Sequence, residues 1–293
     1  MYSEKEIEQL NESLNESNIK IKNNDFVIPL ILFIILVVLI FNYSFNDNQY
    51  SCNHVLQNTY LYVFASLVLF HMLTMYFVKN KYVQMIESFI RQIGPFTYII
   101  LFVIMITFLI YLFHSHQTDI IASHIILFIL IAVFSYLFSY IYILLKLNNL
   151  YKPVVLTLFI TLILIGCLFY MKRDYMISSL KENHYILVLY IGLIVIFANL
   201  IYYMIYGYNR THRILYSIIL IMIFIYVLMY DTKKILEITP QKCKRALVDC
   251  NLNKESCDLN YYPSYPQKSF EIFHDIIILF REMAHIFLAY NNQ

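Results

Sequence analysis

The stretch VIPLILFIILVVLIFNY, residues 27–43, decides the fold class of this chain. The hydrocarbon core of a bilayer is crossed by a helix of about 20 apolar residues, and this stretch has close to that length without a charge. A backbone in lipid must satisfy its own hydrogen bonds, and the stretch does not alternate between apolar and polar residues, so a helix is predicted. No basic segment and no small-residue cleavage site accompany it, so we interpret it as a retained span and not as a signal peptide.

Seven further stretches of the same kind follow along the chain. They are residues 60–78, 95–113, 120–145, 153–171, 185–207, 214–230 and 270–290. Hydrophobic residues make up 60% of the 293 positions and charged residues 14%, whereas soluble domains carry about 25% charged residues. The sequence therefore predicts an all-α polytopic membrane helix bundle with about eight transmembrane helices, or seven if the last helix lies on the surface.

A polar N-terminal tail, residues 1–25, precedes a single bundle formed by residues 26–293. The net charge is only +2, so no basic field for nucleic acid is expected, and the main partner is the lipid bilayer. Lys and Arg are divided equally between the two sides of an eight-span topology. The positive-inside rule therefore gives no orientation.

Four cysteines fall on one side of that topology, three of them in the long loop of residues 231–268. They are Cys52, Cys243, Cys250 and Cys257. They form two disulfides if that side is lumenal or extracellular, and they stay reduced if it is cytosolic. Both alternatives remain open. The spacing in the loop does not match the short cysteine pairs of zinc sites, so no metal is expected there.

The common motifs of nucleotide-binding and hydrolytic enzymes are missing from the sequence. We therefore expect no enzyme and no cofactor. Two Glu-x-x-His pairs, Glu271 with His274 and Glu282 with His285, match a motif that supplies di-iron ligands in helix bundles. They lie on one predicted helix about 16 Å apart, at 1.5 Å per residue, so they do not share a metal pair.

The last predicted helix, SFEIFHDIIILFREMAHIFLAY over residues 269–290, differs from the others because it is both apolar and charged. At about 100° per residue its ionisable side chains fall within an arc of roughly 120°. They are Glu271, His274, Asp275, Arg281, Glu282 and His285. We call this set the polar arc.

Three interpretations of the polar arc stay open from periodicity. The helix lies on the membrane surface with the arc in water, or the arc is buried in structural ion pairs such as Arg281 with Glu282. In the third, the helix spans the membrane and the arc lines a water-filled path or a proton-sensing site. A charge near the bilayer centre costs at least ~2.5 kcal/mol, so such residues are rarely placed there without a role.

Three short segments resemble the transmembrane Bax-inhibitor-motif family, also called Bax-inhibitor-like or lifeguard proteins. Residues 171–175 (MKRDY) are similar to the family's Lys-Arg/Lys-Asp-Phe, and residues 229–233 (MYDTK) to its Tyr-Asp-Thr-Gln. Residues 270–281 (FEIFHDIIILFR) resemble its Leu-x-Leu-Tyr-Leu-Asp-Ile-Ile-x-Leu-Phe segment. The resemblance extends roughly over residues 153–290. The family usually has seven hydrophobic segments, whereas this chain has eight, and Lys233 stands where the family has Gln.

The resemblance implies a pH-sensitive calcium or cation leak channel that suppresses cell death. Asp231 and Asp275 match the paired aspartates that serve the family as a pH-sensitive latch. Two close carboxylates in a medium of low dielectric share a proton, and losing it separates their helices by repulsion. Glu271, Glu282, His274 and His285 belong to the polar arc alone and are candidates to extend the ion path or to titrate near neutral pH.

Two other classes of function remain alternatives. One is a membrane scaffold or viral-envelope-type protein whose polar arc contacts a membrane-protein partner. The other is a proton-coupled secondary carrier that uses the same arc. The expected location is an endomembrane, of the endoplasmic reticulum or Golgi, or a host membrane, and the family places the cysteine-containing loop in the cytosol.

Overall fold

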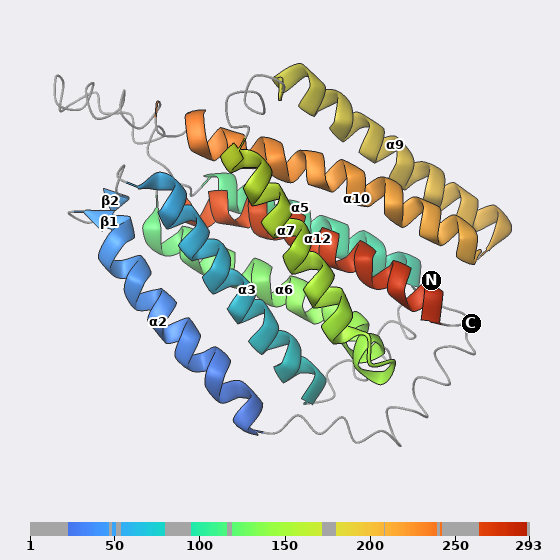
Figure 1. Cartoon of the computed structure of the whole chain (residues 1–293), viewed down its shortest axis with the longest axis horizontal. Helices are drawn as coiled ribbons and strands as arrows, with labels where there is room; N and C mark the ends of the chain where they lie inside the picture. Colours follow the sequence, from blue (N-terminus) through green and yellow to red (C-terminus); the bar gives the residue numbers. More distant parts are fainter. Residues whose placement is uncertain are drawn as a thin grey trace. The chain divides into compact units, whose positions relative to one another are not determined.

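A computed structural model of the chain describes residues 23–46, 49–50, 54–79, 95–115, 119–171, 180–207, 209–238, 241 and 264–291. Eight long helices account for nearly all of these residues (Figure 1). They are α2 (Val27–Ser44), α3 (Val55–Lys79), α5 (Pro95–Ser115), α6 (Ile120–Leu147), α7 (Tyr151–Met171), α9 (Glu182–Tyr206), α10 (Arg210–Lys233) and α12 (Tyr265–Asn291). The predicted all-α bundle is confirmed.

Four short elements complete the described chain. A 3-10 turn, η1 (Asn23–Phe26), precedes α2, and a π-helical turn, η2 (Lys234–Ile238), continues α10. The strands β1 (Phe45–Asn46) and β2 (Gln49–Tyr50) pair antiparallel between α2 and α3. The cysteines Cys52, Cys243, Cys250 and Cys257 lie outside the described residues, as does most of the N-terminal tail.

Two helix boundaries differ from the predicted spans because polar residues near the helix ends are helical too. Helix α3 begins at Val55 and not at residue 60, and its added turn contains Asn58 and Thr59, both buried. The Asn58 amide donates to the Tyr43 backbone oxygen at 3.1 Å and to the Tyr265 hydroxyl at 3.2 Å. These bonds satisfy polar groups that hydropathy alone assigns to a loop.

The loop predicted over residues 231–268 is shorter in the structure. Helix α10 and η2 extend without a break to Ile238, and α12 starts at Tyr265. Pro266 occupies the first turn of α12, where its missing N–H costs no helical hydrogen bond.

The described chain divides into two compact units. One contains residues 21–140 and 232–273. In this unit α2 packs along α3, and the short η2 also contacts α3. Its core contains an aromatic cluster in which Phe273 lies edge-on to Phe70, with ring centroids 5.7 Å apart, and to Phe134 at 6.4 Å. Buried hydroxyls such as those of Thr74 and Ser135 donate to carbonyls of the preceding helical turn, as polar side chains do inside membrane helices.

The other unit contains residues 141–231 and 274–293. Its helices α9 and α10 form an antiparallel pair (Figure 1). Tyr185 stacks on Tyr230 with a centroid separation of 4.1 Å, and near the other end of the pair Tyr202 stacks on the His212 ring at 3.6 Å. The missing side chain of Gly192 leaves room for Ile223. Small residues allow this kind of close helix approach in lipid.

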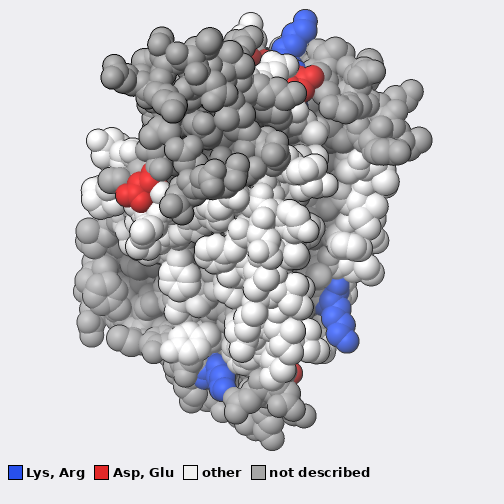
Figure 2. All heavy atoms as spheres, turned by 90° about the vertical axis from the view of Figure 1, so that its left-hand side faces the viewer, with Lys and Arg blue, Asp and Glu red and all other residues white. Residues whose placement is uncertain are grey.

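Five of the described helices are long and apolar enough to cross a membrane, namely those within Val27–Ser44, Val55–Lys79, Ile120–Leu147, Glu182–Tyr203 and Arg210–Glu237. Helices α5 and α7 contain shorter apolar segments. Many large apolar side chains on these helices are exposed, and Figure 2 shows one face with few charged residues. An apolar surface of this extent belongs against lipid. The chain is therefore an integral membrane protein.

Candidate functional site

The segment Tyr230-Asp231-Thr232 lies in the last turn of α10, and its three side chains have different surroundings. Tyr230 stacks on Tyr185 of α9. The Thr232 hydroxyl lies 3.3 Å from that of Tyr60 on α3. Asp231, between them, is only 5% exposed. The π-helical turn that follows is an element often found at functional sites.

Asp275 lies near the middle of α12 and is 3% exposed. The His274 Nδ1 lies 3.6 Å from the Asp275 Oδ1, a contact that is an ion pair when the imidazole is protonated. The His274 ring meets Phe224 of α10 edge-on, with centroids 6.2 Å apart, and Asp231 acts electrostatically on the same imidazole. The structure thus places Asp231, His274 and Asp275 in one compact unit, on two helices that contact each other.

Glu282, two turns further along α12, is fully buried. Its Oε1 accepts from the Arg281 Nε at 2.7 Å and lies 2.6 Å from the Arg281 Nη2. Its Oε2 accepts from the Ser217 hydroxyl of α10 at 2.8 Å. The carboxylate therefore has a partner on each oxygen. His285, one turn beyond, lies within electrostatic range of Arg281 and of Arg213 on α10.

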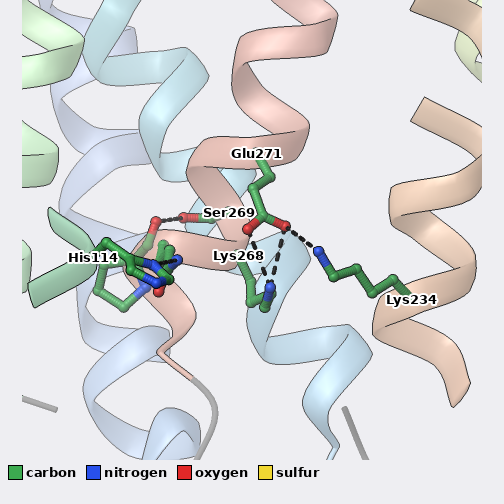
Figure 3. A network of polar contacts seen from close by, with 7 residues as sticks. His114, Lys234, Lys268, Ser269 and Glu271 are labelled. Carbon is green, nitrogen blue, oxygen red and sulfur yellow. Dashed lines mark hydrogen bonds and ion pairs between the residues drawn. The ribbon is translucent and has the colours of Figure 1, made fainter. Parts of the chain in front are cut away.

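Glu271 belongs to the other compact unit, at the first turns of α12 (Figure 3). The Lys268 Nζ donates to both of its oxygens, at 3.1 and 3.2 Å, and the Lys234 Nζ lies 3.7 Å away. Lys268 comes from α12 itself and Lys234 from η2. We call these three residues the lysine clamp. The Glu271 side chain is 27% exposed, so the clamp is partly open to its surroundings.

The polar arc is therefore one stripe on α12 with different surroundings along its length. Asp275 and Glu282 are buried, which argues against a surface helix whose whole arc faces water. The Arg281–Glu282 ion pair considered from the sequence is present. Sequence reasoning missed the α10 partner Ser217 because nothing in the pattern of α10 distinguishes that serine. Lys268 was detectable, since it precedes Glu271 by the three residues that favour helical ion pairs.

No cluster of three or more His, Cys, Asp or Glu side chains able to hold a metal occurs within the part of the chain that the structure describes. The cysteine-containing loop lies outside that part.

These features define a class. The chain is a multi-pass helical membrane protein in which the last helix holds buried acidic side chains against the preceding one. A comparison with protein families matches residues 52–293 to the family described as Inhibitor of apoptosis-promoting Bax1. The match covers most of the chain, and the protein belongs to this family. The comparison with curated proteins gave no match, and neither did the comparison with solved structures.

The matched region is wider than residues 153–290, over which the sequence resemblance was seen, and it includes the first half of the bundle. Seven of the eight long helices in the described chain, α3 through α12, lie inside it. This number equals the seven hydrophobic segments that the resemblance implies. Helix α2 (Val27–Ser44) precedes the match and is the helix that this chain has in addition.

Proposed function

We propose that this protein is a pH-sensitive calcium or cation leak channel that lowers the calcium content of an endomembrane compartment and so restrains cell death. It performs no enzymatic reaction in this proposal and needs no cofactor. Its family membership supports the assignment to Bax-inhibitor-like proteins. The single observation that carries the proposal is the burial of two carboxyl groups, Asp231 and Asp275, on the contacting helices α10 and α12.

The physical basis is the cost of charge at membrane depth. An isolated carboxylate there costs several kcal/mol, so a buried aspartate either carries a proton or pairs with other groups. When two such groups share one proton they titrate together, and they repel once the proton leaves. Repulsion between Asp231 and Asp275 then moves α12 away from α10 and exposes carboxylate oxygens, the ligands that calcium prefers.

His274 gives this mechanism a second titratable group beside Asp275. A protonated imidazole 3.6 Å from the carboxylate stabilises the aspartate anion, and a neutral one does not. The pH response therefore belongs to the set of Asp231, His274 and Asp275 and not to one residue. Glu271 and His285 lie on the same stripe of α12 and are candidates to extend the path towards its two ends.

The proposal is tested with purified protein reconstituted in vesicles loaded with calcium and a fluorescent calcium indicator. We expect calcium to leave down its gradient at a rate that changes with pH, while empty vesicles retain their calcium. A flat response at every pH contradicts the channel and favours a membrane scaffold or envelope-type protein.

A second arrangement of the same vesicles separates the channel from a proton-coupled carrier. Calcium is set equal on both sides, and a pH difference alone is imposed with the membrane potential clamped. A channel gives no net calcium movement, because no electrochemical gradient for calcium exists. Net accumulation of calcium driven by the pH difference contradicts the channel and identifies a carrier.

A further inference from the structure

Ser217 is a fully buried polar residue in the middle of α10, where residues 214–229 are otherwise apolar or tyrosine. Its hydroxyl donates to the Glu282 Oε2 at 2.8 Å. Other buried serines, Ser123, Ser139 and Ser269 among them, donate instead to a carbonyl of their own helix, as Ser135 does to Ile131 at 2.7 Å. The single hydroxyl donor of Ser217 thus forms a hydrogen bond between two helices, and the acceptor is the Glu282 carboxylate.

The Ser217–Glu282 bond lies within a regular set of contacts between α10 and α12. On one side of the Ser217–Glu282 bond, the Arg210 Nη2 donates to the Tyr290 backbone oxygen at 3.3 Å. On the other side, the Phe224 ring packs edge-on against the His274 ring. Arg210, Ser217 and Phe224 follow one another at intervals of seven residues, so they share one face of α10. Their partners Tyr290, Glu282 and His274 follow at intervals of eight, in reverse order. The two helices therefore pack antiparallel in one register.

The same faces carry the two aspartates. Asp275 precedes Glu282 by seven residues, about two helical turns, and so lies on the same side of α12. Asp231 follows Phe224 by seven residues on α10. A bond that fixes the register at Ser217 and Glu282 consequently fixes the place of the aspartate on each helix.

We infer that Ser217, Arg281 and Glu282 form an anchor that holds α12 against α10 and positions Asp275 relative to Asp231. The anchor itself is a structural assignment, and its role in setting the aspartates rests on the proposed function. Ser217 is a positioning residue that acts through Glu282. Glu282 is an anchoring group and not a ligand of the permeant ion, because each of its oxygens already has a donor.

The balance of charge around Glu282 supports this role. Arg281 neutralises the carboxylate from the same helix, while the neutral Ser217 adds the bond that crosses to α10. Among the described residues, Tyr216 on α10 lies within electrostatic range of Glu282 and Arg281, and also of Arg213 on α10 and Tyr203 on α9. His285 on α12 lies within range of Arg281 and Arg213. Serine at this position supplies a donor without adding a charge, and a hydrogen bond to a charged acceptor is among the stronger ones.

The register is measured directly by cysteine cross-linking. The five native cysteines are replaced by serine, and Phe224→Cys is combined with His274→Cys, so that oxidation in vesicles forms a disulfide between α10 and α12. Adding Ser217→Ala removes the bond between the helices and should lower the cross-linking rate roughly threefold to tenfold. Ser217→Thr keeps the hydroxyl and should restore most of the rate. Ser135→Ala, equally buried, should leave it unchanged.

The second readout is the pH midpoint of calcium leak, measured for Ser217→Ala in the otherwise native chain. We expect the midpoint to shift, with Ser217→Thr close to native, whereas a serine that only fills space leaves it unmoved. An unchanged cross-linking rate in Ser217→Ala overturns the anchor, whether or not the protein leaks. A lower rate in a protein that does not leak keeps the anchor and refutes the channel.

Discussion

Helices α9 and α12 are nearly equal in length but differ in their content of charged residues and in how much of their surface is buried. Helix α9 (Glu182–Tyr206) is apolar from Tyr185 to Ala198, and only 6% of its candidate membrane span is buried inside the protein. Helix α12 (Tyr265–Asn291) carries six ionisable residues between Glu271 and His285, yet most of its side chains are buried, Asp275 and Glu282 among them. The apolar helix faces outwards and the polar helix faces inwards.

This difference teaches how each helix is held in a membrane. Helix α9 is stable in lipid through its own surface, because every exposed apolar side chain is solvated by acyl chains. Helix α12 depends on its neighbours, because Phe70 and Phe134 pack against its buried Phe273 ring and Ser217 of α10 donates to its buried Glu282 carboxylate. A helix such as α9 should tolerate substitutions between apolar residues but not the introduction of a charge. A helix such as α12 should be destabilised by the loss of a packed aromatic ring or of a hydrogen-bond partner.

The largest effect is expected in the aromatic core around α12. Phe273→Ala removes a fully buried ring that contacts Phe70 and Phe134, and should lower the free energy of unfolding by about 3–5 kcal/mol. Phe197→Ala on α9, where the ring is 55% exposed, should cost much less, since lipid fills the vacated space. Unfolding of both variants in mixed micelles measures the contrast, and equal losses contradict it.

A charge on α9 is the next strongest test. Ile194 lies near the middle of α9 and is 64% exposed. Ile194→Lys places an ammonium against lipid without a partner, and the apparent free energy of membrane insertion of this helix should become less favourable by about 2.5 kcal/mol or more. Ile194→Leu is the matched control and should insert as the native helix does. Normal insertion of the lysine variant means that α9 does not face lipid.

The lysine clamp should give the smallest effect. Glu271→Gln removes the charge that Lys234 and Lys268 contact, but the group is partly exposed, so the cost should stay below about 1 kcal/mol. Because screening weakens exposed ion pairs, the difference from the native protein should shrink as salt rises. A loss of several kcal/mol that salt does not alter shows that Glu271 is buried in the membrane-embedded protein, and the contrast with Glu282 disappears.

Much of the fold was predictable because a backbone in hydrocarbon must form all its hydrogen bonds internally, which a helix does. Long apolar runs such as residues 27–43 and 185–207 become helices wherever they occur in lipid. The stripe of charges on α12 was equally visible, since periodicity depends on one helix alone. The extension of α3 back to Val55 was not visible, because Asn58 is stabilised by Tyr43 and Tyr265, which are distant in sequence.

The candidate site was predictable only in part, and for the same reason. Asp231 and Asp275 were found through a family resemblance, and their burial is a property of the folded chain. Ser217 carried no signal, because one serine in an apolar helix has the same pattern whether it bonds to its own backbone or to another helix. The pairing of Ser217 with Glu282 requires the register of two helices, which no single sequence pattern contains.

The most direct test of the central claim compares the pH dependence of calcium leak in three proteins. These are the native chain, the double variant Asp231→Asn with Asp275→Asn, and the control Asp119→Asn. Asp119 is exposed at the start of α6, where asparagine caps a helix as well as aspartate does. If the buried aspartates are the pH-sensitive latch, the double variant leaks at a rate that no longer changes with pH, while the control keeps the native profile. A double variant with the native pH profile contradicts the account.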